Sequence, residues 1–197
     1  MTSTSTTTTY TTKTPDATPV PVFRIKALPN TAFPAIGNAY VKLTGSGAHV
    51  AALFTASVNE ATTFRLALDP RAAGFATAPG LPTLADDDGY SGSLVALFSN
   101  PTSYSAAQIQ SGSFASILFE PRSVLTNPAF SGVLFDILCS RPSVVADGAL
   151  SCAYGDKTYF ATDSLISNPN GAYLRLVNSA DLPYVVQLSL VVEEVSP

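Results

Sequence analysis

The chain is built from short apolar runs separated by turn residues, and no segment has the spacing of an amphipathic helix of about ten residues or more. Phe64 and Leu66, for example, fall on one side of an extended chain and Arg65 on the other, as in a half-buried strand. The pattern predicts an all-β fold of about 11–12 short strands, with a polar segment at 100–112 that holds one helical turn. The predicted strands are 23–28, 40–43, 50–57, 62–68, 93–99, 114–120, 133–139, 150–154, 157–162, 173–177 and 184–190.

An all-β chain of this length closes into a barrel or packs as a sandwich. The first block, 22–68, reads as a strand, a G-x-x-Y strand, a strand and an F-x-L strand, and it resembles one lobe of a β-trefoil, a family with three lobes of four strands. The residues that carry this likeness are Gly37, Tyr40, Leu43, Phe64 and Leu66. The last block, 150–190, resembles a lobe less closely, and loops stretch the middle one. We therefore expect a single β-trefoil-like domain over 22–197, with a β-sandwich or jelly roll as the alternative.

Both cysteines lie in the stretch 133–163, whose turn signals at Asp147-Gly148 and Gly155-Asp156 predict three antiparallel strands. Cys139 and Cys152 are thirteen positions apart, and folding the segment back on itself can bring their Cα atoms within the roughly 5.5–6 Å that a disulfide needs. A Cys139–Cys152 disulfide would imply an oxidising compartment. The alternative is a pair of reduced thiols that pack as small apolar side chains.

The composition excludes two classes of partner. Charged residues make up only 12% of the chain and the net charge is −4, with ten Lys and Arg scattered along the sequence. Nucleic-acid binding needs clustered cations, so we expect neither a nucleic-acid partner nor a basic membrane-binding patch. No apolar run approaches the roughly 18–20 residues of a transmembrane helix. We therefore predict a chain without a membrane span.

Residues 1–21 are rich in threonine and end in spaced prolines, a composition that does not form a core. This segment is predicted to be a disordered leader, or an O-glycosylated stalk if the protein is secreted. It lacks the charged region and apolar region of a signal peptide. The sequence is thus compatible with a secreted protein whose leader has been removed and with a cytosolic one.

A resemblance adds to this reading. The threonine-rich leader is followed by the motifs A-Y-V-K-L, A-T-T-F-R-L and G-A-L-S-C. In this order they resemble uncharacterised domains of secreted or cell-wall-associated fungal proteins, which commonly follow Ser/Thr-rich stalks. The likeness extends over most of 22–192, but this chain lacks the further C-terminal cysteine of the family. The resemblance implies an extracellular or cell-wall location and no established catalysis.

Motifs for catalysis are sparse. The single histidine, His49, follows a glycine-rich turn and is expected to flank that turn rather than act as a base, and no serine lies in a G-x-S-x-G elbow. A glycosidase needs a pair of carboxyl groups, for which the sequence offers several scattered glutamates. These are Glu60, Glu120, Glu193 and Glu194. We expect a protein that is not an enzyme and uses no cofactor, and a hydrolase is the least favoured alternative.

Binding residues are easier to nominate. Tyrosine rings stack on sugars, and nearby carboxylates accept hydrogen bonds from hydroxyl groups. The candidates are Tyr90, Tyr104, and Tyr159 with Asp163, although each ring is also suited to ordinary packing. Asp86, Asp87 and Asp88 supply oxygen ligands for a metal such as calcium, or form a solvated acidic turn.

The expected function is therefore a non-enzymatic extracellular or cell-surface module that binds a glycan or cell-wall polymer. The alternative is a structural coat or wall protein that self-associates, because a surface with so few charges opposes assembly only weakly.

Overall fold

The computed structural model describes residues 22–45, 50–68, 90–97, 103–109, 112–140, 148–164, 169–179 and 181–195. These residues form fourteen β-strands and very little helix, so the all-β prediction is confirmed. The strands are β1 (Phe23–Ala27), β2 (Tyr40–Thr44), β3 (Val50–Thr55), β4 (Thr63–Leu68), β5 (Tyr90–Ala96), β6 (Ser103–Ile109), β7 (Phe114–Pro121), β8 (Leu134–Asp136), β9 (Leu138–Ser140), β10 (Cys152–Ala153), β11 (Tyr159–Asp163), β12 (Arg175–Val177), β13 (Val185–Leu188) and β14 (Leu190–Glu194).

The helical elements are single turns that connect strands. They are η1 (Pro34–Ile36), η2 (Val58–Glu60), α1 (Arg122–Leu125), η3 (Pro128–Phe130) and η4 (Pro169–Gly171). Proline at the start of η1 and η3 suits a helical first turn, where no N–H is needed, and the Asn127 side chain accepts a hydrogen bond from the N–H of Ala129. Within the described residues, no helix has the length and apolar character needed to cross a membrane.

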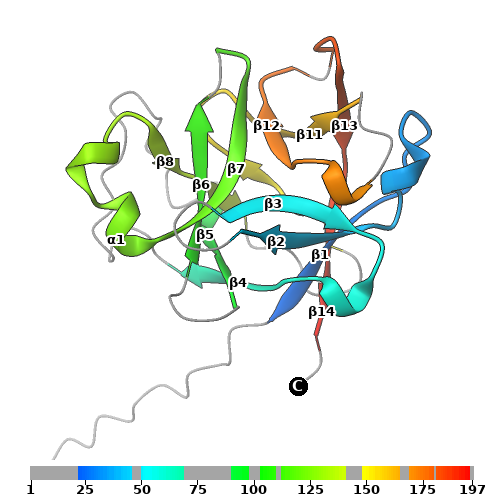
Figure 1. Ribbon diagram of the computed structural model, residues 1–197, viewed down its shortest axis with the longest axis horizontal. Coiled ribbons are helices and arrows are strands. Elements are labelled where there is room, and N and C mark those ends of the chain that lie inside the picture. Colours follow the sequence, from blue (N-terminus) through cyan, green and yellow to red (C-terminus); the bar gives the residue numbers. More distant parts are fainter. Residues whose placement is uncertain are drawn as a thin grey trace, which may run out of the picture.

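The antiparallel strands close into a seven-stranded barrel in the order β1, β2, β3, β7, β6, β5 and β4 (Figure 1). β1 closes this ring because β4 and β2 pair with successive parts of the same edge of β1. Arg24 pairs with Thr63 of β4, whereas Lys26 pairs with Tyr40 of β2. The other edge of β1 pairs with β14 along its whole length. The chain therefore forms a barrel, not the two separate sheets of a sandwich.

A second ring of pairings connects β1 and β14, the first and last strands of the described residues. β1 pairs with β4, β4 with β5, β5 with β9, and β9 with β10. The segment before β10 then meets β14, where the N–H of Leu150 donates to the carbonyl of Leu190 at 2.9 Å and that of Val192 to Gly148 at 3.1 Å. Since β14 pairs with β1, this ring is also closed. The last strand is thereby fixed against the first.

The core fills the inside of the barrel with large apolar side chains. Phe54 and Phe64 have no exposed surface, and the ring centroids of Phe64 and Phe119 are 5.4 Å apart. A small apolar cavity contains one polar side chain, that of Ser105, whose hydroxyl accepts from the N–H of Leu94 and donates to the carbonyl of Ile137. The hydrogen-bonding capacity of this hydroxyl is therefore used within the fold.

The predicted disulfide is present. Cys139 of β9 and Cys152 of β10 are direct partners in the ladder, with Cα atoms 3.9 Å apart, and neither residue has exposed surface. The two cysteines are therefore not free thiols, and the bond links two adjacent strands of the second ring.

The structure corrects the prediction for 100–112. Instead of a helical turn, Ser103–Ile109 form β6, which pairs with β5, β7 and β8. Ser105, Ala106 and Ala107 are buried, and small side chains suit a strand that is crowded by neighbours. Two predicted strands are also interrupted, one at Ile137 between β8 and β9 and the other at Ser189 between β13 and β14, so the strand count exceeds the predicted 11–12.

Candidate functional site

The outer side of β11 carries two of the predicted binding residues. Tyr159 is 41% exposed and Asp163 is partly exposed, whereas Phe160 and Thr162, which alternate with them, are buried. Since successive side chains in a strand point to opposite faces, Tyr159 and Asp163 lie on the same outward face. β11 pairs on one edge with β12 and on the other with β13, and these strands gather on one side of the barrel (Figure 1).

An ion pair forms the centre of this face. Arg175 of β12 stands opposite Ala161 in the ladder, and its Nη2 donates to Oδ2 of Asp163 at 2.7 Å. The guanidinium also lies 5.1 Å from the centroid of the Phe114 ring, which β7 contributes. The side chains of Arg175 and Asp163 are 18% and 30% exposed. Partial burial and the ring hold the guanidinium in place more firmly than at a surface ion pair.

Tyr173 extends the face beyond the end of β12. Its neighbours Ala172 and Leu174 are buried, whereas Tyr173 is 45% exposed and alternates in phase with Arg175. It also forms a β-bridge with Leu53 of β3. We call the outward surface made by Phe114, Tyr159, Asp163, Tyr173 and Arg175 the β11–β12 face.

Sequence reasoning found Tyr159 and Asp163 but missed the other three members of this face. The alternation Tyr173-Leu174-Arg175-Leu176 places the tyrosine and the arginine on the same side of a strand, and this signal could have nominated them together. Alternation along one strand could not have predicted Phe114, because this residue joins the face only through the pairing of β7 with β12, where Phe114 is opposite Val177.

The remaining candidates lie elsewhere. Tyr104 is partly buried on β6, opposite Glu120 at the far end of β7 from Phe114, and Tyr90 begins β5 opposite Ser140. The structure therefore does not bring either tyrosine to the β11–β12 face. The acidic run 86–88 and His49 lie outside the described residues. Among the residues that are described, no group of three or more His, Cys, Asp or Glu could hold a metal ion.

The glutamates considered for hydrolysis are in different places. Glu193 of β14 accepts a hydrogen bond from the Tyr40 hydroxyl at 3.0 Å. Partial burial of Tyr40 raises the pKa of its hydroxyl above the ordinary value, and the hydrogen bond to Glu193 raises it further by a smaller amount. Glu120 is fully buried on β7, Glu60 belongs to η2, and Glu194 is exposed at the end of β14.

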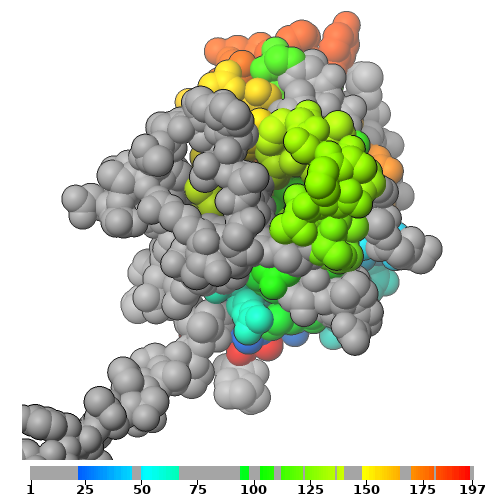
Figure 2. Space-filling model, turned by 90° about the vertical axis from the view of Figure 1, so that its left-hand side faces the viewer, coloured from blue at the N-terminus to red at the C-terminus, as the bar shows by residue number. Residues whose placement is uncertain are grey.

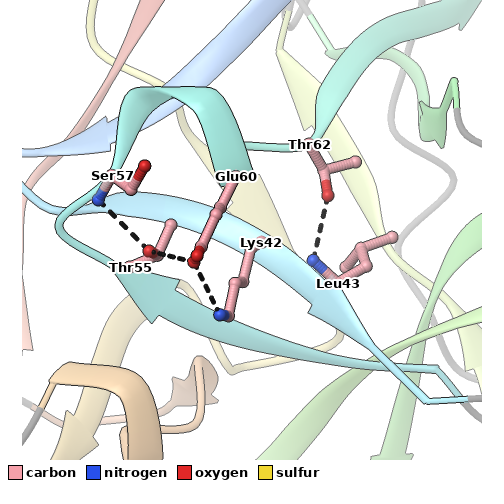
Figure 3. A network of polar contacts seen from close by, with 6 residues as sticks. All are labelled: Lys42, Leu43, Thr55, Ser57, Glu60 and Thr62. Atoms are coloured by element: carbon pink, nitrogen blue, oxygen red, sulfur yellow. Dashed lines mark hydrogen bonds and ion pairs between the residues drawn. The ribbon is translucent and has the colours of Figure 1, made fainter.

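Glu60 is part of a polar network that joins β2, β3 and η2 (Figure 3). Its Oε2 accepts from Nζ of Lys42 at 2.9 Å and from the Thr55 hydroxyl at 2.8 Å, and the Thr55 oxygen accepts from the N–H of Ser57. The bonds from Lys42 and Thr55 lower the pKa of Glu60 from its ordinary value of 4.5. All bonds of this network are internal, so we assign it to the fold rather than to ligand binding.

Asp156 is a second carboxylate whose pKa is lowered by internal hydrogen bonds. Asp156 accepts from Asn178 at 3.1 Å and from Lys157 at 3.0 Å, and these two bonds lower its pKa from the ordinary value of 3.8. The Lys157 side chain is only 8% exposed, whereas Asp156 is 66% exposed. The exposed carboxylate thus keeps a nearly buried ammonium paired.

These two shifts predict the acid limb of stability. A carboxyl group with a lower pKa in the folded state contributes stability above its unfolded pKa and loses it as the pH falls through the folded pKa. Stability should therefore fall below about pH 4, and the double variant Glu60→Gln, Asp156→Asn should show a shallower fall. Urea unfolding at a series of pH values measures this. An identical slope in the variant and the wild type would contradict the assignment.

Comparisons with known proteins do not assign the chain to a family. A scan against protein-family models found none that matches the chain, and a search of curated proteins found no significant match.

Proposed function

We propose that this protein is a non-enzymatic extracellular or cell-surface module that binds a glycan through the β11–β12 face. The proposal rests on one observation: the Asp163–Arg175 ion pair lies on the same outward face as the exposed rings of Tyr159 and Tyr173. A tyrosine ring offers a flat apolar surface to a sugar ring. Carboxylate oxygens accept hydrogen bonds from sugar hydroxyls, and guanidinium N–H groups donate to them.

Binding suits this face better than glycoside hydrolysis does. A glycosidase places two carboxyl groups about 5–10 Å apart, one to protonate the leaving group and one to act as nucleophile or base. The carboxylate of the β11–β12 face is instead paired with a guanidinium at 2.7 Å. This arrangement fixes the orientation of both charged groups and favours recognition of hydroxyls.

The disulfide supports the extracellular part of the proposal. Disulfides persist mainly in oxidising compartments, and this chain uses both of its cysteines in one. A secreted or wall-associated protein would meet glycan polymers there.

We also propose that the fourteen strands together form a β-trefoil. Three blocks of four strands support this: β1 to β4, β5 to β9, and 148–153 to β14, if the interrupted pairs β8/β9 and β13/β14 each count as one strand. Each block contains a hairpin: β2–β3, β6–β7 or β11–β12. The hairpins meet through the pairs β3–β7 and β7–β12 and the Leu53–Tyr173 bridge. In an experimental structure, rotation about a single axis should superpose the three blocks on one another. Blocks that are related in any other way would contradict the trefoil.

The function is tested by depletion of the protein from solution by insoluble β-glucan, chitin, mannan and cellulose. We expect at least one polymer to bind the wild type, and we expect Tyr159→Ala to weaken that binding by about 1–2 kcal/mol, or roughly tenfold in Kd. Val133→Ala is the control, since Val133 is 45% exposed and directly precedes β8. α1 and β8 lie on the left of the molecule in Figure 1, the side that faces the viewer in Figure 2, whereas β11 and β12 lie to their right in Figure 1. Equal loss in both variants would contradict the proposed site.

Self-assembly is the second candidate. The low charge of the chain and exposed apolar side chains such as Leu28, Leu97 and Val133 favour it. Size-exclusion chromatography over a concentration series separates the two functions: a constant monomer volume supports the glycan-binding module, and growth of larger species supports the coat protein.

A further inference from the structure

Tyr184 combines a strained backbone with an exposed ring. Its φ is 65°, in the left-handed region that a bulky side chain rarely adopts. The residue is 69% exposed, the largest value among the exposed large apolar and aromatic side chains of the described residues. Burial of the ring therefore does not compensate for the strain. Strained residues that persist without a packing reason are concentrated at ligand-binding sites.

The pairing of β11 places Tyr184 at one end of the β11–β12 face. Its carbonyl accepts a hydrogen bond from the N–H of Ser164 at 2.9 Å, and the next residue, Val185, pairs with Asp163. Tyr159 is at the other end of β11. Four residues of extended chain separate the two ends, a distance of roughly 13 Å.

We infer that Tyr184 is a further aromatic contact of this face, and that the ligand is an extended oligosaccharide chain lying along β11 rather than a single sugar. This inference rests on the proposed glycan-binding function. The exposed ring of Tyr159 contacts one part of the chain, the Asp163–Arg175 pair bonds hydroxyls between, and Tyr184 contacts the other end. Tyr184 directly precedes Val185, the ladder partner of Asp163, so its exposed ring is available to a ligand at this end of β11.

A matched pair of glycine variants tests this role. Glycine adopts positive φ without strain, so Tyr184→Gly removes the ring and relieves the backbone together. Asn38→Gly is the control, because Asn38 has φ 64° but lies between η1 and β2, where its N–H donates to the carbonyl of Ala27. Both variants should unfold at an unchanged or higher urea concentration than the wild type. A clear loss of stability in Tyr184→Gly alone would mean that the ring is a packing residue and would overturn the inference.

Binding is then measured by calorimetry with β-1,3-glucan and chitin oligosaccharides, from the monosaccharide upward. The wild type should bind longer oligosaccharides more tightly. Tyr184→Gly should lose about tenfold in affinity for the long ones and little for the short ones, and Asn38→Gly should match the wild type.

These measurements distinguish a failure of the role inferred for Tyr184 from a failure of the proposed glycan binding. If the wild type binds and Tyr159→Ala weakens binding, but Tyr184→Gly has the affinity of the wild type at every length, the proposed function stands and the inference about Tyr184 is overturned. If the wild type binds neither these oligosaccharides nor the insoluble polymers, the proposed function fails, and the inference fails with it.

Discussion

Phe64→Ala is expected to lower the free energy of unfolding by about 3–5 kcal/mol, the largest effect of any change considered for this protein. Phe64 is fully buried on β4, and β4 belongs to both closed rings of strands through its pairs with β1 and β5. Its ring contacts that of Phe119 on β7. Truncation therefore leaves a cavity between parts of the barrel that are far apart in sequence, and such a site has little freedom to collapse.

Urea unfolding followed by circular dichroism measures this loss. Phe64→Leu retains most of the volume and should cost distinctly less, and Leu97→Ala, at a position that is 37% exposed, serves as the surface control. A loss for Phe64→Ala no greater than that of Leu97→Ala would contradict the placement of Phe64 in the barrel core.

Removal of the disulfide is expected to have the second largest effect. The double variant Cys139→Ala, Cys152→Ala should lose about 2–4 kcal/mol, because the bond closes a loop in the unfolded chain and so lowers its entropy. The sequence separation of the two cysteines is 13. The bond also holds β10 against β9, the only strand that β10 pairs with among the described residues.

Reduction provides an independent check of the same prediction. Both cysteines lack exposed surface, so a reductant should act slowly on the folded protein and rapidly once urea has opened it. The reduced wild type should then unfold at the same urea concentration as the double variant. Unfolding curves that coincide for oxidised and reduced protein would show that the disulfide adds no stability.

The sequence predicted the strands whose large apolar residues alternate. β4 and the strands of the two cysteines are examples, because Phe64 and Leu66 alternate with Arg65 along β4 and Cys139 pairs directly with Cys152. β6 was missed because Ser103, Ser105, Ala106 and Ala107 are buried by crowding rather than by hydrophobicity, so period-two contrast is absent.

The candidate site was only half predictable for a related reason. Tyr159 and Asp163 lie on one strand, where an even spacing is enough to place both on the same face. Arg175 and Phe114 join them through pairing between β11, β12 and β7. The register of strands that are distant in sequence depends on the whole barrel, and no local pattern encodes it.

The most direct test of the glycan-binding account is to map the contact surface by NMR, with backbone amide shifts followed during titration with soluble β-1,3-glucan and chitin oligosaccharides. The account predicts shift changes centred on β11, β12 and the residues around Tyr184. Changes centred on other strands, or no change with any oligosaccharide, would contradict it.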